Sequence, residues 1–288
     1  MAIELIVELG KHYTWESFQR LTSLGSLALD GIVIARTQFT DTHGVIDHHL
    51  LEPADSTCKQ ALDLIKKGIL SSFKFALFDH GDEDVDTTYT ALNNPSLCDD
   101  PNFEQLVSVE NSLDINAGMY PIGDPDLRES IAWIYEPYHI VRFNGTLPQL
   151  KADGLKTIIY ETESRILAYV KGNGKRRSLV GQYDILGYAA GYVIVDENGP
   201  DARMAMCSAG IKAFISFVGR TNGCFRYSFY RSPDCDDSVL LPSQLCSKLN
   251  LIESLPFDKG WGFGGPRGGS SKMYGSKLSP EQLKQALS

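Results

Sequence analysis

The chain has 288 residues, of which 43% are hydrophobic and 22% are charged, a composition typical of a globular protein rather than a disordered one. Its formal net charge of −9 argues against a general nucleic-acid coat protein, because such proteins are basic. An acidic chain can still act on phosphate esters, since bound cations reverse the field inside an acidic site. The length is sufficient for one large or two ordinary domains.

The cysteines and the N-terminal residues indicate the compartment. Six cysteines are scattered and form no Cys-x-x-Cys pair, so we expect reduced thiols in a cytoplasmic protein rather than a zinc–thiolate site. Residues 1–10 contain two glutamates and no basic segment, which does not match a secretory signal peptide. No apolar run approaches the ~20 residues that cross a bilayer, so we expect no membrane partner. An oligomer is compatible with the sequence, which does not specify one.

Strands and helices alternate along the first half of the chain. Apolar, β-branched runs predict strands at 3–9, 29–35 and 73–78. Helical spacing follows each of them, at 14–24, from 56 or 57 to near 68, and at 87–92. Further on, 103–109 fits a short helix or strand, and 126–135 is helical. This alternation predicts an α/β fold with a mostly parallel sheet in an N-terminal domain of residues 1–145.

The pattern changes after a polar connector, residues 146–182, in which 157–170 has helical spacing. Alternating and aromatic runs predict strands at 183–195, 202–206 and 224–230. An amphipathic helix is predicted at 241–251, and a terminal helix has Pro280 in its first turn. We therefore expect a second, smaller α+β domain, residues 183–288, which includes a glycine-rich loop at 260–271.

Two polar clusters contain four of the six histidines. The first, Asp41–His49, follows the predicted strand that ends at Ala35, and the second, Asp79–Asp86, follows the strand that ends at Phe78. Strand ends in an α/β protein direct side chains from neighbouring loops into one crevice. We therefore expect the two clusters to form one site.

The residue types in these clusters favour metal chemistry. The ligands are nitrogen and oxygen atoms without a thiolate, which suits Mn²⁺ or Mg²⁺ better than structural zinc. Two such ions about 3.5–4 Å apart could activate water and stabilise an in-line displacement at phosphorus. The alternative is that an acidic run such as 82–86 forms a solvated turn. In the metal site, Asp82 and Glu83 are expected to be bystanders, because the five acidic side chains of residues 79–86 cannot all face one site.

Three segments resemble a known family. Asp47-His48-His49, preceded by Val45-Ile46, resembles the namesake motif of the DHH phosphoesterase superfamily. His80-x-x-x-Asp84-x-Asp86 is similar to the second hallmark of that superfamily. The glycine-rich loop resembles the substrate-binding glycine motif of the C-terminal domain associated with these enzymes. The resemblance implies a Mn²⁺-dependent N-terminal domain and a C-terminal domain that closes over the substrate.

The resemblance also assigns roles to residues. It implies two Mn²⁺ ions, with Mg²⁺ as an alternative, held by Asp47, His48, His80, Asp84, Asp86 and Asp114. It implies catalytic roles around the scissile phosphate for His49, Asp47 and His48. Substrate binding falls to Gly264, Gly265, Arg267, Gly268, Gly269 and Ser270. The glycine-rich loop would let backbone N–H groups approach an anion, whereas the alternative is a tight turn anchored by Trp261 and Phe263.

The order of the two hallmark motifs is reversed relative to the family, because Asp47–His49 precedes His80. A rearranged topology, an accidental match of one motif, or a distant branch would each explain this order. A different ligand set, in which Asp41 and His43 join Asp47, is a further alternative. His12 and His139 lie far from both clusters in sequence and are expected to be structural, although folding could bring His12 close.

The sequence therefore predicts a metal-dependent phosphohydrolase. Its substrate would be a phosphodiester or phosphoanhydride in a nucleotide, a short oligonucleotide or a polyphosphate. The alternative is a non-catalytic nucleotide- or ligand-binding protein on the same scaffold, in which the altered motif order reflects lost chemistry.

Overall fold

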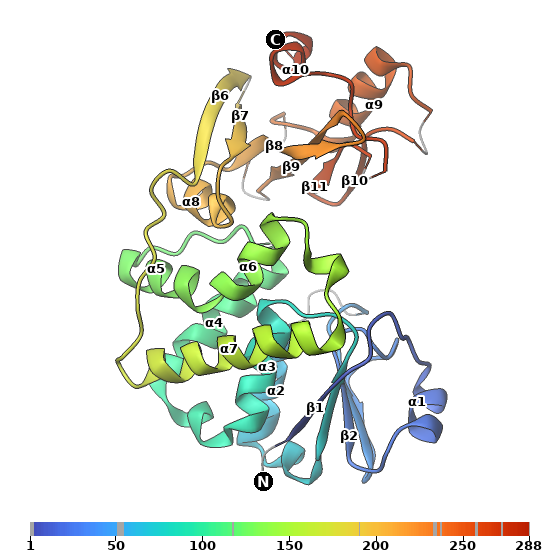
Figure 1. The fold of residues 1–288 in the computed structure, drawn as a ribbon, viewed down its shortest axis with the longest axis vertical. Coiled ribbons are helices and arrows are strands. Elements are labelled where there is room, and N and C mark those ends of the chain that lie inside the picture. Colours follow the sequence, from blue (N-terminus) through green and yellow to red (C-terminus); the bar gives the residue numbers. More distant parts are fainter. Residues whose placement is uncertain are drawn as a thin grey trace. The chain divides into compact units, whose positions relative to one another are not determined.

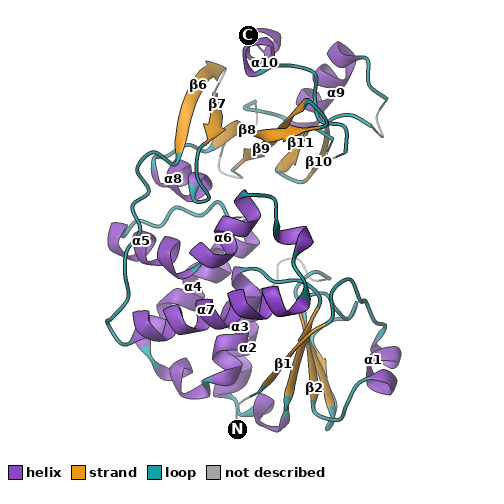
Figure 2. Cartoon of the chain, viewed as in Figure 1, coloured by secondary structure: helices purple, strands orange, loops and turns teal. Residues whose placement is uncertain are grey.

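The computed structural model describes residues 3–50, 55–116, 118–189, 191–232, 235–236, 238–256, 259–271 and 273–287 (Figures 1 and 2). The chain divides into two compact units, Met1–Ser178 and Leu179–Ser288. Each unit contains its own sheet with helices packed against it, so the predicted α/β class and the second, smaller unit are confirmed. Within the described ranges, no helix combines the length and apolar character that crossing a bilayer requires.

The first unit is built on a five-stranded sheet in the order β1-β5-β2-β4-β3. These strands are β1 (Glu4–Val7), β2 (Ser26–Leu29), β3 (Gln38–Phe39), β4 (His43–Ile46) and β5 (Phe75–Phe78). β1, β5, β2 and β4 are parallel, and the short β3 pairs antiparallel with β4. All four residues of β2 are buried, as expected for a parallel strand covered on both faces.

The predicted strand at 29–35 is wrong, because β2 ends at Leu29. Asp30 and Gly31 have φ values of +50° and +83°, which turn the chain out of the strand. Ile32 and Val33 gave a strand-like pattern because they are buried, but they pack with Phe18 beside the sheet. The strand that precedes the Asp-His-His motif is β4, which lies inside the first polar cluster.

Helices cover both faces of this sheet (Figure 2). Phe18 of α1 (Trp15–Leu21) packs on one face, against Ala28 and Val45. On the other face, the core contains side chains of α2 (Thr57–Lys66), α3 (Glu83–Asn93) and α7 (Ala152–Val170). The remaining helices are α4 (Pro101–Ile115), α5 (Pro125–Ile134) and α6 (Glu136–Phe143), with the short 3₁₀ turns η1 (Ile69–Ser72), η2 (Pro95–Asp99) and η3 (Leu147–Gln149).

Two of these helices, α4 and α7, extend beyond the ranges predicted from the sequence. Asp100 caps α4 by accepting hydrogen bonds from the N–H groups of Asn102 and Phe103, and the helix continues to Ile115. Asp114 therefore lies in the last turn of this helix. Most of the predicted connector is α7, whose Leu155 and Ile159 are buried in the first unit's core.

The second unit contains a six-stranded sheet in the order β10-β11-β9-β8-β7-β6. The strands are β6 (Tyr183–Ala189), β7 (Tyr192–Glu197), β8 (Ala213–Thr221), β9 (Cys224–Arg231), β10 (Gly262–Gly264) and β11 (Arg267–Gly269). Its helices are α8 (Ala202–Ser208), α9 (Pro242–Glu253) and α10 (Pro280–Leu287). The strand predicted at 202–206 is wrong, because β7 and β8 are parallel and need a crossover, which α8 provides.

A candidate metal centre at the carboxyl edge of the first sheet

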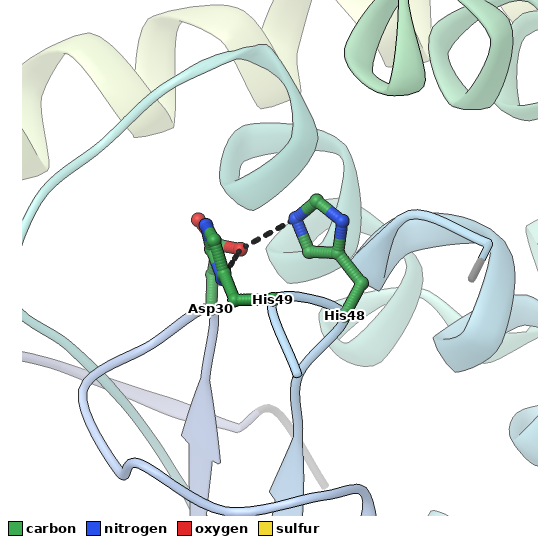
Figure 3. Close-up of side chains that lie close together, drawn as sticks. All are labelled: Asp30, His48 and His49. Carbon is green, nitrogen blue, oxygen red and sulfur yellow. Dashed lines mark ion pairs between the residues drawn. The ribbon is translucent and has the colours of Figure 1, made fainter. Parts of the chain in front are cut away.

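Three adjacent parallel strands end at the same edge of the sheet. Each is followed by an acidic side chain, and two of them, β4 and β5, are also followed by histidines. Asp30 follows β2, Asp47–His49 follows β4, and Asp79–His80 follows β5. Because the carboxyl ends of parallel strands lie side by side, these residues meet in space. Figure 3 shows the side chains of His48 and His49 directed toward Asp30 from the neighbouring strand end.

The sheet topology explains why the two motifs meet although their order in the chain is reversed. β2 lies between β4 and β5 in the sheet, so the Asp-His-His motif and His80 flank Asp30 on its two sides. Strands that are neighbours in the sheet bring their ends together whichever comes first in the chain. The motif order therefore does not prevent the two clusters from forming one site.

Among the residues that the structure describes, the cluster contains three groups that could each hold a metal ion. In each group, ligand atoms from all three residues lie within 4.8 Å of one another. The groups are Asp30/His48/His49, Asp30/His80/Asp82 and His48/Asp84/Asp114. The last two share no residue, so they form two separate three-ligand sets. His48 and Asp30 connect these sets to each other.

Asp30 is the centre of this cluster. Its Oδ1 lies 3.2 Å from Nε2 of His48, and its Oδ2 lies 3.2 Å from Nε2 of His80. Burial by itself raises the pKa of Asp30, but hydrogen bonds from both histidines outweigh burial and hold the pKa below its usual range. Asp30 therefore contacts one histidine from each of the two separate ligand groups, so it could help to hold metal ions in either of them.

Sequence reasoning missed Asp30. It was included in a predicted strand, where a charged residue is unexpected. The signal that could have identified it is an Asp-Gly pair that interrupts the apolar run at 27–35. Its buried position at positive φ is also unusual, although Asp tolerates that conformation better than most residues.

Buried carboxylates orient two of the histidines. Asp79 Oδ1 lies 2.6 Å from Nδ1 of His80, which leaves Nε2 directed toward Asp30. Asp47 Oδ1 accepts the backbone N–H of His49 at 3.0 Å and lies 2.8 Å from its Nδ1. Carboxylates commonly fix metal-bound or catalytic imidazoles in this way. Asp47, which was predicted to bind metal, is in none of the three groups and contacts His49 instead.

His48 and Asp84 belong to the same ligand group, and Asp84 connects this group to the start of α2. Burial by itself lowers the pKa of His48, but Asp30 and the charges of Asp114 and Asp84 raise it to about 9. The two oxygens of Asp84 accept the backbone N–H groups of Cys58 at 2.7 Å and Thr57 at 2.8 Å. A helix N-terminus stabilises such a carboxylate, and each of its oxygens keeps a lone pair for a metal ion.

The site contains more acidic groups than its histidines can neutralise. Even if all three histidines, His48, His49 and His80, are protonated, they supply only three positive charges. The carboxylates around them are Asp30, Asp82, Asp84, Glu110 and Asp114. Burial and the neighbouring carboxylates raise the pKa values of Asp82 and Glu110 well above their usual range. Burial and Asp84 raise the pKa of Asp114 to about 7.

Oε2 of Glu110 is buried without a hydrogen-bond partner among the described residues. Oδ2 of Asp114 also accepts no hydrogen bond there, and its nearest charged neighbour is Nε2 of His48 at 3.5 Å. Glu110 lies one helical turn before Asp114 on α4, and therefore on the same face of that helix. Unpartnered buried carboxylate oxygens are costly unless a cation or a proton neutralises them. The residues present therefore fit a divalent cation.

The second motif has a different spacing from the predicted one. Asp82 caps α3 by accepting the N–H of Val85 at 2.9 Å, and it joins Asp30 and His80 in one group. Asp86 follows Asp84 by two residues, about 200° around the helix, and is in none of the three groups. Burial raises the pKa of Asp86 to about 8, even though the hydroxyl of Thr162 acts in the opposite direction. The observed grouping is thus His-x-Asp-x-Asp.

Other residues considered in the sequence lie outside the three groups. His43 is buried in β4 at the opposite edge of the sheet, where its ring contacts Phe18 edge-on at 5.5 Å. Asp41 is exposed and precedes that strand. His139 of α6 lies 2.6 Å from Glu83, which connects α6 to the start of α3. The alternative set of Asp41, His43 and Asp47 does not assemble.

The glycine-rich loop forms the β10–β11 hairpin, with Gly265 at φ +59° in the turn. A Cβ at Gly268 would lie 2.3 Å from the carbonyl oxygen of Gly262, and one at Gly269 would lie 2.2 Å from that of Tyr227. Ser270 Oγ accepts the N–H of Tyr227 at 3.0 Å. Close packing thus accounts for Gly268, Gly269 and Ser270, and the exposed part of the predicted substrate loop is Gly264, Gly265 and Arg267.

Comparisons with known proteins do not identify a family. No family model, no curated protein and no solved structure matches the chain. The function is therefore inferred from the residues and distances of the site itself.

Proposed function

We propose that this protein is a metal-dependent phosphohydrolase that uses two divalent cations. The observation that supports this most directly is the pair of adjoining three-ligand groups, Asp30/His80/Asp82 and His48/Asp84/Asp114. Both groups lie in a partly buried cluster with an excess of carboxylates. The resemblance of Asp47–His49 and of the His80 segment to DHH phosphoesterases supports the same function.

The donor set favours Mn²⁺, with Mg²⁺ as the alternative. Each group offers one imidazole and two carboxylates, and neither includes a thiolate. Asp30, His80 and Asp82 would hold one ion, and His48, Asp84 and Asp114 the other. Two such ions would polarise a phosphoryl oxygen and lower the pKa of a bound water.

His49 is the residue best placed to exchange a proton with the substrate. Its side chain is 54% exposed, whereas that of Asp47 behind it is 2% exposed. The hydrogen bond to Asp47 raises the pKa of His49 and occupies Nδ1, so that Nε2 can face the substrate. A histidine held in this way suits general acid catalysis at the leaving oxygen.

The substrate class follows from the metals and the net charge. A two-metal site suits a phosphodiester or phosphoanhydride, in a nucleotide, a short oligonucleotide or a polyphosphate. The charge of −9 favours a small substrate over a long nucleic-acid strand. The resemblance to DHH phosphoesterases would also assign a substrate-binding role to the exposed Gly264, Gly265 and Arg267 of the second unit.

Turnover of bis-p-nitrophenyl phosphate with and without added Mn²⁺ tests the proposal. We expect Mn²⁺-dependent release of p-nitrophenol by the full chain, and its loss in Asp84→Ala. Full activity in Asp84→Ala would contradict the assignment. Mn²⁺ uptake without turnover of any phosphate substrate would favour the alternative, a non-catalytic ligand-binding protein.

A further inference from the structure

One edge of the second unit's sheet carries exposed apolar side chains. β6 is the outermost strand on this side, next to β7 (Figure 1). Among the described residues, its backbone hydrogen bonds are those of the ladder with β7, so its outer edge is unpaired there. Ile185, Leu186 and Tyr188 on this strand are 42%, 38% and 69% exposed. An unpaired edge of this kind recruits another strand unless lysine or proline blocks it, and β6 contains neither residue.

A β-bulge gives the side chains of β6 a symmetric arrangement. The register with β7 shifts between Ile185 and Gly187, so Ile185 and Leu186 oppose one residue of β7. Side chains on either side of the bulge therefore face the same side of the sheet although they are an odd number of residues apart. Outward from the middle of the strand, the like-facing pairs are Ile185 and Leu186, Asp184 and Gly187, and Tyr183 and Tyr188.

A strand with this symmetry is complementary to a second copy of itself. A two-fold axis through the bulge would place two β6 strands antiparallel, with Ile185 opposite Leu186 and Tyr183 opposite Tyr188 of the other copy. Aliphatic and aromatic pairs that lie directly opposite each other stabilise a sheet. The same strand therefore supplies both halves of an apolar contact.

The charges beside β6 are complementary under the same axis. Asp184 lies directly opposite Asp196 of β7, where like charges repel each other. Burial, Asp184 and Glu197 raise the pKa of Asp196. On the same face, Lys284 of α10 lies over Gly187, where a Cβ would be 2.9 Å from its Cδ. The axis would bring Lys284 of each copy to the acidic pair of the other copy.

We propose that β6 pairs antiparallel with β6 of a second copy of this chain, in a two-fold symmetric dimer with one continuous sheet. A strand from a different protein would require neither the symmetric spacing of the two tyrosines nor the opposite charges on the two halves of β6. One strand pair is a small interface, so we expect a dissociation constant in the micromolar range.

Sedimentation equilibrium of the full chain across the micromolar range tests this pairing. We expect the wild type to pass from monomer to dimer. Leu186→Lys places a charge beside the axis in each copy and should raise the dissociation constant about 100-fold. Leu251→Lys is the matched control, because Leu251 is an exposed leucine on α9 of the same unit, and its dissociation constant should stay within about twofold of the wild type. A wild type that stays monomeric, or an equal loss in both variants, would overturn the proposal.

A charge exchange tests the symmetry itself. Asp184→Lys and Lys284→Asp each turn both charged contacts of the dimer into repulsions, and each should raise the dissociation constant about tenfold. In an equimolar mixture, one variant supplies both positive groups and the other both negative groups, so a mixed dimer regains two attractive contacts. We expect the mixture to recover the wild-type dissociation constant within about threefold, and circular dichroism checks that each variant is folded. A mixture no tighter than either variant alone would show that β6 does not pair with itself in this register.

Discussion

Replacing Asp30 with asparagine should remove the connection between the two ligand groups while leaving the fold intact. Asparagine has the same shape, tolerates the φ of +50° at this position, and can still accept the hydrogen bond from Thr57. The change removes the negative charge that faces both His48 and His80 at 3.2 Å. It therefore alters the electrostatics of the site more than its packing.

The expected magnitude follows from the burial of Asp30, which is 2% exposed. Removing one partner from a buried charge pair costs about 3–5 kcal/mol. If that loss appears in metal binding, Mn²⁺ affinity should fall roughly 10²–10⁴-fold, at 1.4 kcal/mol for each factor of ten. Calorimetric titration of the wild type and the variant with Mn²⁺ measures this change, and circular dichroism checks that both are folded.

Asp86→Asn is the matched control, because Asp86 is equally buried on α3 but lies outside the three groups. Its pKa, raised to about 8 by burial, makes it largely neutral at pH 7, so asparagine changes its charge little. We expect Mn²⁺ affinity within about twofold of the wild type. Wild-type affinity in Asp30→Asn, or an equal loss in Asp86→Asn, would refute the reasoning about Asp30.

Three further predictions concern proton release, catalysis and packing. Mn²⁺ binding should release protons. Asp30 and Asp79 raise the pKa of His80 to about 11, and Asp30 raises that of His48 to about 9, so at pH 7 both rings carry a proton that a metal ion must displace. Mn²⁺ affinity should therefore rise with pH, and a binding enthalpy that does not depend on the buffer would contradict this. His49→Ala should lower kcat about 10²–10⁴-fold while bound Mn²⁺ stays unchanged, and parallel loss of metal would show that His49 is a ligand instead. Gly268→Ala should destabilise the second unit by about 1–3 kcal/mol, since its Cβ would lie 2.3 Å from a carbonyl oxygen. Gly264→Ala is the control, because a Cβ at Gly264 would meet no atom within 4 Å. Equal melting temperatures of the two variants would contradict the packing argument.

Much of the first unit's fold could be predicted from sequence. β5 is a short apolar run covered on both faces, and such runs are recognisable because every residue is apolar. Asp47–His49 and His80 were also predicted to meet, since both follow strands in an α/β pattern. The confirmed fold class therefore came from periodicity, which is a local property of the chain.

The remaining features depend on contacts between distant segments or on helix geometry. Asp30 lies at the centre of the candidate metal site only because β2 lies between β4 and β5 in the sheet. The order of strands in a sheet cannot be predicted from the local sequence. Asp82 rather than Asp86 joins the site because Asp82 caps α3, which sets the rotation of the residues that follow. The position of Asp114 depends on how far α4 extends. The sequence pattern at 103–109 fitted either a short helix or a strand, so it did not predict this length.

The most direct test of the account is the number and arrangement of Mn²⁺ ions bound to the full chain. Titration followed by electron paramagnetic resonance reports free Mn²⁺, bound Mn²⁺ and magnetic coupling between neighbouring ions. We expect about two bound ions per chain, as a two-metal site requires, with a coupled spectrum when both sites are filled. No bound Mn²⁺, or a single uncoupled ion that persists in both Asp30→Asn and Asp84→Ala, would contradict the two-metal centre.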